Sequence, residues 1–391
     1  MRSNKIQREC NNHNNILRNV KHVYACSSKK FINSLSGNLM ITGGSHVKRK
    51  DLLLRAVSQQ RQISCEPVII FSENNQFQSD LIELAERGEI GELFVCSSEY
   101  KNYDFFCNMN TTQIIDYYSD IASLKGYKDT SELHDFVGSF LNILSGRAPI
   151  KLASIYQFSK NTDTSIANIA GIKSVDYDMI IASSRGGINF RRLLSESCNA
   201  FDTITTPSCD TGFNIRTAIN NDCVIFINVN TVNFEFLSLY FLQELKSVIN
   251  KNFTVIFDDS IILNNTELIE FIKIIKQKEN VNVIVSHENI LSLPGSENLE
   301  HFKKQVIMLD GNISSNDIQK ILSKFGEYSH FESTVTIGNT PHLFFSFFES
   351  ESNNITQYSR PKILLEEIYG NSVVLSGHNG SEILVAKKFI I

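Results

Sequence analysis

Residues 253–259 read Phe-Thr-Val-Ile-Phe-Asp-Asp, and the prediction of the fold starts from this stretch of the 391-residue chain. A run of apolar and β-branched residues leads directly into two carboxylates. A strand that is apolar throughout has both faces covered, as in a buried parallel sheet. The acids stand at its carboxyl end, the edge at which α/β sheets bind ligands. The stretch therefore predicts a parallel α/β sheet with Asp258 and Asp259 at a Mg-nucleotide site.

The flanking sequence alternates strand and helix patterns in the same way. Short apolar runs that predict strands occur at residues 38–42, 67–71, 93–96, 223–229, 281–285 and 306–309. Amphipathic or apolar-faced helices are predicted between several of them, the longest at 234–249. Strands that alternate with helices indicate a mostly parallel sheet with helices on both faces.

Three domains follow from the pattern. Between residues 106 and 172 the strand pattern gives way to apolar residues at helical spacing, and another helix is predicted over 186–199. Near the end, 334–337 and 343–348 predict paired strands, 317–325 a helix, and 373–375 with 383–389 a hairpin. The predicted domains are a basic, partly disordered arm (1–36), an α/β domain (37–105 and 200–391) and an inserted, mainly helical domain (106–199).

Composition describes an ordinary globular protein, with 42% hydrophobic and 20% charged residues. The net charge of −5 gives no overall field that attracts nucleic acid. Residues 1–36 are basic, which indicates a solvated tail or, alternatively, an arm that contacts nucleic acid or a membrane surface. The eight cysteines show no CxxC pair and the histidines no metal-ligand spacing, so we expect reduced thiols and no zinc. No run of 18 apolar residues is present, which predicts a cytoplasmic protein without a membrane span.

A glycine-rich turn after the first strand resembles a phosphate-binding loop. In the pattern G-x-x-x-x-G-K-[ST], glycines let backbone N–H groups wrap the phosphates, Lys reaches the β/γ oxygens, and the hydroxyl ligates Mg²⁺. Gly43 and Gly44 end the strand, and Gly44 begins the best register. Lys50 is correctly spaced, whereas Arg49 replaces the second glycine and Asp51 the hydroxyl residue. The alternative is an ordinary β–α turn.

The acidic pair supplies the other half of the predicted site. Asp258 would hold Mg²⁺ through water, and Asp259 would polarise the attacking water. Aspartate is one methylene shorter than the glutamate usual at the second position, and the geometry of a catalytic base is strict. The alternative is that both acids cap the following turn.

Taken in order, these pieces resemble the TraG/TraD-type coupling proteins of conjugation and type IV secretion, within the FtsK/HerA group of hexameric P-loop ATPases. The resemblance covers roughly residues 37–391. It includes the second strand (67–71), the entry to the helical domain (103–106), the strand and long helix before the acids (223–249), and a closing element (360–389). It implies ATP and Mg²⁺ as cofactors, an oligomer such as a hexameric ring, and DNA and conjugation or secretion proteins as partners.

Three departures from the family pattern bear on activity. The family's γ-phosphate-sensing Gln is replaced by Ser286 and His287, and no Arg stands at 277–279, where the family carries its trans-acting finger. An arginine finger contributes on the order of 10³–10⁵ in rate. The family also begins with transmembrane helices, which this sequence lacks. The resemblance thus implies a pseudo-ATPase that binds nucleotide weakly with little or no hydrolysis.

Two further motifs carry side chains that could serve catalysis or bind an anion. Ser286, His287 and Glu288 are adjacent, but a catalytic triad needs convergence in space rather than in sequence. Arg185 comes directly before Gly186 and Gly187, and Arg191 and Arg192 follow on a predicted helix. A helix N-terminus with glycine and arginine nearby could bind phosphate. A solvated basic face is the simpler interpretation, and DNA binding the second.

Three functions therefore stay open. The first is a degenerate coupling-protein-like subunit or adaptor in or beside DNA-transfer machinery, placed in the cytoplasm or at the membrane through a partner. The second is an active oligomeric DNA-translocating ATPase that uses Lys50, Asp258 and Asp259. The third is a scaffold that keeps the fold and binds no nucleotide.

Overall fold

The structure is a computed structural model. It describes residues 2–18, 20–23, 37–146, 148–160, 184–206, 213–229, 234–258, 266–275, 277–288, 302, 304–308, 326–341, 347–362, 373–376 and 383–386. The chain divides into two compact units. The first contains Met1–Phe31, Met40–Arg49 and Phe302–Ile391, and the second contains Ile32–Leu39 and Lys50–His301.

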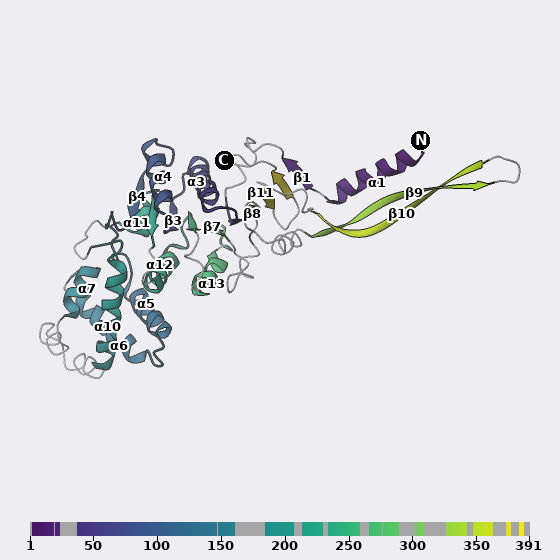
Figure 1. The fold of residues 1–391 in the computed structure, drawn as a ribbon. Coiled ribbons are helices and arrows are strands. Elements are labelled where there is room, and N and C mark those ends of the chain that lie inside the picture. Colours follow the sequence, from purple (N-terminus) through teal and green to yellow (C-terminus); the bar gives the residue numbers. More distant parts are fainter. Residues whose placement is uncertain are drawn as a thin grey trace. The chain divides into compact units, whose positions relative to one another are not determined.

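The second unit is built on five parallel strands (Figure 1). In spatial order they are β7 (Val281–His287), β6 (Phe253–Asp258), β3 (Val68–Ser72), β5 (Val224–Asn228) and β4 (Leu93–Cys96). All six residues of β6 are buried, as are all five of β3. The continuous apolar run of β6 therefore forms the buried, doubly covered parallel strand that the sequence predicted.

Helices cover both faces of this sheet. The ring of Phe71 lies 5.1 Å from that of Phe241 on α12 (Phe234–Val248) and stacks on Phe257. Phe226 pairs in register with Ile70, so it points to the face opposite Phe71. There its ring lies 6.0 Å from Phe77 of α4 (Asn75–Glu86).

Four helices of this unit form a separate group (Figure 1). They are α5 (Thr111–Leu124), α6 (Ser131–Ser145), α7 (Leu152–Ser159) and α10 (Ser184–Phe201). Buried rings join the group to α12, among them Phe106, Tyr117, Phe201 and Tyr240. Two short helices, α11 (Ile215–Asn220) and α13 (Thr266–Ile275), precede β5 and β7.

The first unit contains shorter strands and a long ribbon. Strands β8 (Lys304–Met308), β11 (Val373–Ser376) and β12 (Ile383–Ala386) pair antiparallel in that order, and β1 (Val20–Val23) adds to β12 in parallel. Strand β2 (Leu39–Gly43) belongs mainly to this unit, whereas α3 (His46–Ser64), which follows it, belongs mainly to the second unit.

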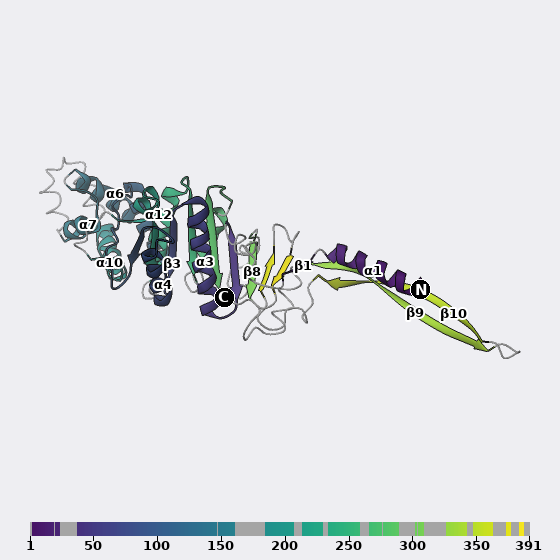
Figure 2. The same cartoon turned by 90° about the horizontal axis from the view of Figure 1, so that it is seen from above.

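The ribbon consists of β9 (Glu327–Pro341) and β10 (Phe347–Pro361), paired antiparallel over 15 residues each. Helix α1 (Arg2–Arg18) lies along it (Figures 1 and 2). The side chain of Asn14 donates to the carbonyl of Phe331 and accepts from its N–H, both at 2.8 Å. Asn14 thus satisfies one outward-facing backbone position of β9, and His13 packs edge-on against the Phe331 ring at 5.3 Å.

Most predicted strands and helices are confirmed, and two regions differ. The predicted strand pair at 334–337 and 343–348 is a much longer ribbon. The prediction was too short because the added residues are largely polar, so no apolar run marks where the strands begin and end. The range 1–36, predicted as a partly disordered arm, contains α1 and β1. The predicted helix at 317–325 lies outside the described residues, and the three domain boundaries stay predictions. In the part of the chain that the structure describes, no helix is long and apolar enough to cross a membrane.

Candidate functional site

A row of polar side chains crosses the carboxyl edge of the sheet in the second unit. Ser72 pairs in register with Asn228, Asp258 pairs with Ser286, and Phe71 pairs with Phe257, which places Ser72 beside Asp258. Register partners in a parallel sheet point to the same face. Asn228, Ser72, Asp258 and Ser286 therefore form one row, hereafter the polar row, on the face covered by α4.

Ser72 fixes the orientation of the central carboxylate. Its hydroxyl donates to Asp258 Oδ2 at 2.8 Å, and both side chains are fully buried. The same hydroxyl accepts from the N–H of Asn74 at 3.1 Å. Asn74 is the N-cap of α4, where its side chain accepts from the N–H groups of Gln76 and Phe77. The start of α4 and the acid at the end of β6 are thus one hydrogen-bonded assembly.

Ser286 has a different environment from its neighbour His287. The Ser286 hydroxyl is fully buried beside Asp258 and makes no hydrogen bond to any described residue. Because successive side chains of a strand alternate, His287 points to the opposite face. The structure therefore brings only Ser286 of the predicted sensor pair to the acid, and the adjacent Ser, His and Glu do not converge as a triad.

The glycine turn is shorter than a full phosphate loop. Gly43 and Gly44 have φ of 78° and 69°, the left-handed region that glycine tolerates. Helix α3 begins at His46, so the residues that would wrap phosphate in the predicted register are already helical. Arg49 is 2% exposed, and its Nη1 donates to the carbonyls of Gly43 (3.2 Å) and Gly44 (2.7 Å). The arginine thus folds back onto the turn and caps it.

Lys50 is held by an acid that the sequence analysis did not consider. Its Nζ lies 2.5 Å from Asp80 Oδ2 on α4 and 3.9 Å from Asp51 Oδ1. Asp80 also accepts from the Gln76 amide at 2.8 Å. The Lys50 side chain is only 11% exposed. In this state its ammonium links α3 to α4, and a phosphate would have to compete with Asp80 for it.

The oxygen atoms of the polar row are suitable ligands for a hard cation. Mg²⁺ prefers oxygen ligands and usually retains waters while binding one or two carboxylates and substrate phosphates. The Asp258 carboxylate and the buried Ser286 hydroxyl meet that requirement, and Ser286 has an unused oxygen. Asp259 lies outside the described residues. Among the residues that are described, no group of three or more His, Cys, Asp or Glu side chains could hold a metal ion.

Gly186 and Gly187, which lie between Arg185 and Arg191, serve helix packing. A Cβ on Gly186 would lie 2.2 Å from the carbonyl oxygen of Glu132, and one on Gly187 would lie 2.8 Å from the Phe136 ring. Both glycines are buried inside α10. They allow α10 to approach α6 closely, so this stretch is a helix–helix contact and not a phosphate-binding turn.

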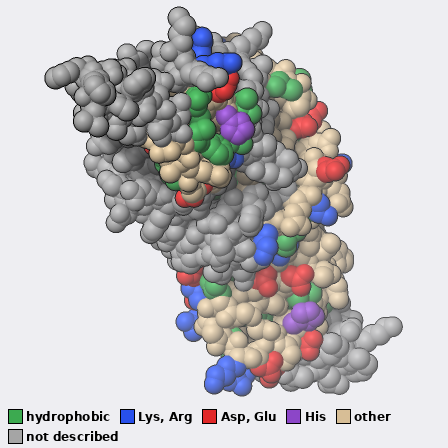
Figure 3. Space-filling view, turned by 90° about the vertical axis from the view of Figure 1, so that its right-hand side faces the viewer, with side chains coloured by type: hydrophobic (Ala, Val, Ile, Leu, Met, Phe, Trp, Pro, Cys, Tyr) green, Lys and Arg blue, Asp and Glu red, His purple; other side chains and the backbone are tan. Residues whose placement is uncertain are grey.

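The three arginines differ in their contacts. Arg191 donates to the carbonyl of Ser159 at 3.1 Å, and Arg192 pairs with Glu196 at 3.2 Å. Arg185 is exposed. On the face drawn in Figure 3, acidic and basic side chains of the described residues are interspersed rather than gathered by sign. DNA binding by Arg185, Arg191 and Arg192 stays a prediction.

A buried acid on α12 was also missed. Glu244 accepts a hydrogen bond from the Tyr103 hydroxyl, which in turn accepts from the N–H of Ile215 at 3.3 Å. Burial raises the pKa of Glu244 to about 7, and the Tyr103 hydrogen bond and Arg216 oppose that rise. Glu244 lies three residues after Phe241 and four after Tyr240, at the helical spacing of a buried face, which is the signal that could have identified it.

The comparisons with known proteins identify the fold. No family model matches the sequence, and no curated protein matches it. The α/β architecture is that of a P-loop NTPase with an inserted all-α part, as the sequence predicted. The plasmid coupling protein TrwB in complex with the ATP analogue ADPNP has this fold, with a TM-score of 0.57 and 12% identity over 97% of this chain and 93% of that one. TrwB in complex with ADP and Mg²⁺ gives a TM-score of 0.53 at 12% identity over 92% and 87%. At this identity the likeness establishes the fold alone.

Proposed function

We propose that this chain is a coupling-protein-like subunit of a DNA-transfer apparatus that binds Mg-nucleotide weakly and hydrolyses it little or not at all. The fold of a conjugative coupling protein over nearly the whole chain supports the setting. The observation that carries the proposal of weak binding is the Lys50–Asp80 ion pair, because it occupies the lysine that the loop pattern places to reach a phosphate.

The proposed nucleotide site consists of Gly43, Gly44, Arg49, Lys50 and Asp51 with Asp258. In it, Lys50 contacts phosphate and Asp258 holds Mg²⁺ through water. Asp259 is the proposed base, and Ser286 and His287 stand at the sensor position. The two-residue turn before α3 offers fewer backbone N–H groups than a full phosphate loop, which again favours weak binding.

The proposed partners follow from the same resemblance. They are other copies of this chain or related ATPase subunits in a ring, secretion or conjugation proteins, and DNA, with the cytoplasm as the proposed location. The proposed division is a basic segment over 1–36, an α/β domain and a helical domain over 106–199.

A scaffold that binds no nucleotide is the second candidate. The specific observation in its favour is again that Lys50 and Arg49 both have partners within the protein, Asp80 for the first and the turn carbonyls for the second. A fold can outlast its activity because the core, not the site, holds it together.

Thermal unfolding with and without millimolar Mg-ATP separates the two candidates. A ligand that binds only the native state stabilises it by about 2.7 kcal/mol at a hundredfold excess over Kd. We expect a small increase in Tm for the wild type and none for Lys50→Ala, with no appreciable ATP turnover. No increase in either protein would support the scaffold. DNA-stimulated hydrolysis that Asp258→Ala abolishes would replace both with an active motor.

A further inference from the structure

Four side chains gather on one face of the ribbon, near the end where β9 begins. Tyr328 pairs in register with Arg360, and register partners of an antiparallel pair lie on the same face. His330, two residues further along β9, pairs with Tyr358, and their rings lie 5.2 Å apart. His330 Nδ1 lies 2.9 Å from the Tyr328 hydroxyl, and its Nε2 lies 3.4 Å from Arg360 Nη1. These four residues are hereafter the histidine cluster.

The Arg360 guanidinium has no acidic partner in the described part of the chain. It carries five N–H donors and keeps its charge at any ordinary pH. Its contact with His330 is the only hydrogen bond or ion pair that it makes to a described residue. Because arginine only donates, His330 Nε2 accepts, and the neutral ring carries its proton on Nδ1 and donates it to the Tyr328 oxygen. Arg360 is half-buried, so a partly desolvated cation lies here without a counter-ion.

A second guanidinium reaches the histidine cluster from α1. Arg18 is the last residue of α1, and its Nε donates to the carbonyl of Lys362, directly after β10. Burial lowers the pKa of His330, and so do the positive charges of Arg360 and Arg18. The charge of Glu332 opposes that shift. Two segments far apart in the sequence therefore bring positive charge to one imidazole.

Two acids of the ribbon stand near the histidine cluster, and each accepts from a neutral hydroxyl. Glu332 accepts from the Tyr358 hydroxyl at 3.2 Å. Glu327 accepts from Ser359 Oγ, and both of these residues lie on the opposite face of the ribbon. Neither acid forms an ion pair with Arg360. Their charges would repel the successive phosphates of a nucleic-acid strand, whereas a single carboxylate can contact Arg360 alone. The charges here therefore favour one anionic group over a polyanion.

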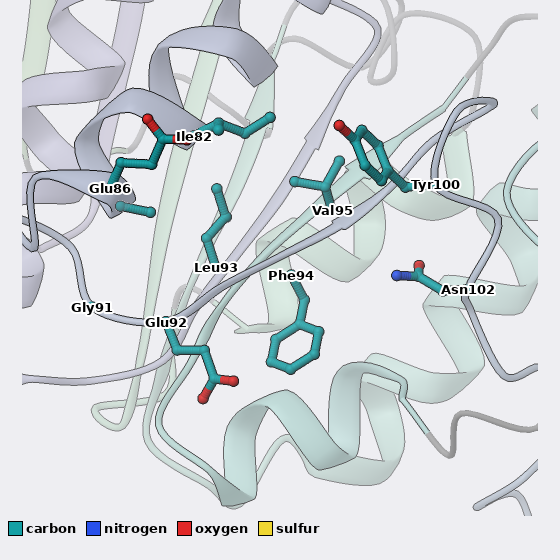
Figure 4. A pocket seen from close by; sticks show the side chains of 10 residues that line it. Ile82, Glu86, Gly91, Glu92, Leu93, Phe94, Val95, Tyr100 and Asn102 are labelled. Carbon is teal, nitrogen blue, oxygen red and sulfur yellow. The ribbon is translucent and has the colours of Figure 1, made fainter.

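The groove between α4 and β4 has no such convergence of charge among the described residues. Its volume is about 510 Å³, and Leu93 and Val95 line it (Figure 4). The carboxylates of Glu86 and Glu92 lie on different sides of β4 in Figure 4. Glu92 Oε2 lies 3.4 Å from Cys223 Sγ. The charges thus select a ligand at the ribbon and not at this groove.

We propose that the histidine cluster binds an aspartate or glutamate side chain in an exposed segment of a partner protein. The planar guanidinium of Arg360 matches the geometry of a carboxylate and can donate two parallel hydrogen bonds to it. Tyr358 is 41% exposed, and its ring offers an apolar surface to the residue beside that acid. A carboxylate that takes the Arg360 donor releases His330 Nε2, which can then bind a proton. The cluster shares no residue with the proposed nucleotide site, so this proposal does not rest on it.

The test is a fluorescence-polarisation titration of the full chain with a labelled, end-capped octapeptide of alternating glutamate and alanine. We expect saturable binding that Arg360→Gln weakens by about tenfold or more, because charge-assisted hydrogen bonds are lost. Arg360→Lys keeps the charge but not the fork, and should weaken binding less. Arg8→Gln is the matched control. It removes the same charge from an exposed position of α1 and should alter Kd less than twofold. Circular dichroism of each variant establishes that it is folded.

The pH dependence separates this site from general charge attraction. Since a bound carboxylate raises the pKa of His330, the complex takes up a proton, and Kd should fall as the pH is lowered from about 8 to about 6. The glutamates of the peptide, with an ordinary pKa of about 4.3, stay ionised throughout. His330→Gln should bind the peptide with a Kd that does not change over this range.

Two further ligands complete the test. A peptide with glutamine in place of glutamate should not bind, and an excess of unlabelled oligothymidylate should not displace the glutamate peptide. The proposal is overturned if the glutamate peptide does not saturate, if the glutamine peptide binds equally well, or if Arg360→Gln leaves the Kd unchanged. It is also overturned if the wild-type Kd is independent of pH, or if the oligothymidylate displaces the peptide, since the cluster would then accept a polyanion.

Discussion

The substitution Asp80→Asn should tighten nucleotide binding, although Asp80 is not a proposed ligand. It removes the charge that holds Lys50 at 2.5 Å, between side chains that are 11% and 23% exposed. Ion pairs near a protein surface contribute up to about 1 kcal/mol. Because about 1.4 kcal/mol corresponds to a tenfold change in affinity, releasing Lys50 should lower the Kd for Mg-ATP by about fivefold. Isothermal titration calorimetry measures this directly.

Two controls make the result interpretable. Glu83→Gln removes the same charge from α4, but its partner is Arg87, so the Kd should stay within twofold of the wild type. Lys50→Ala added to Asp80→Asn should cancel the gain. If Asp80→Asn leaves the Kd unchanged or weakens binding, Asp80 does not compete with the phosphate for Lys50, and our explanation of weak binding is wrong.

Four further substitutions test the packing and electrostatics described above. Ser72→Ala should lower the free energy of unfolding by about 1–3 kcal/mol in urea titrations, because it removes a hydrogen-bond donor from the buried Asp258 carboxylate; an unchanged midpoint would contradict this. Gly187→Ala should destabilise the folded protein by about 1–3 kcal/mol through overpacking against Phe136. In Gly138→Ala the new Cβ would lie 3.5 Å from its nearest neighbour, an ordinary contact, so this substitution should stabilise α6 slightly. Since Glu244 has a folded pKa of about 7 against an ordinary 4.5, the folded state binds its proton more tightly, so its contribution to stability is full below pH 4.5 and falls by about 3 kcal/mol as the pH rises to 7. Glu244→Gln should remove that fall from the pH profile, and an identical profile would refute the assignment.

The sequence predicted the sheet well because burial leaves a local mark. Strand β6 is apolar throughout since both its faces are covered, and that pattern is visible without knowledge of its neighbours. The position of Asp258 follows from the same run. The ribbon was underestimated, because β9 and β10 carry polar residues along their length and their pairing with each other decides their extent.

The partners of the site residues could not be predicted, because they depend on register and helix position. Ser72 meets Asp258 across 186 positions of sequence, and only the pairing of β3 with β6 brings them together. Asp80 is one of several acids on α4 until α3 is placed beside it. The start of α3 at His46 was also missed, because the motif pattern fixes spacing but not where the helix begins.

The two hydrogen bonds between Asn14 and Phe331 have a consequence for folding during synthesis. The two residues are 317 positions apart. At about 5–20 residues per second, α1 leaves the ribosome roughly 15–65 seconds before β9 has been made. A helix of 17 residues is marginal in water by itself. Helix α1 therefore spends that interval without its binding surface, and nascent chains halted before residue 331 should present it to chaperones and proteases.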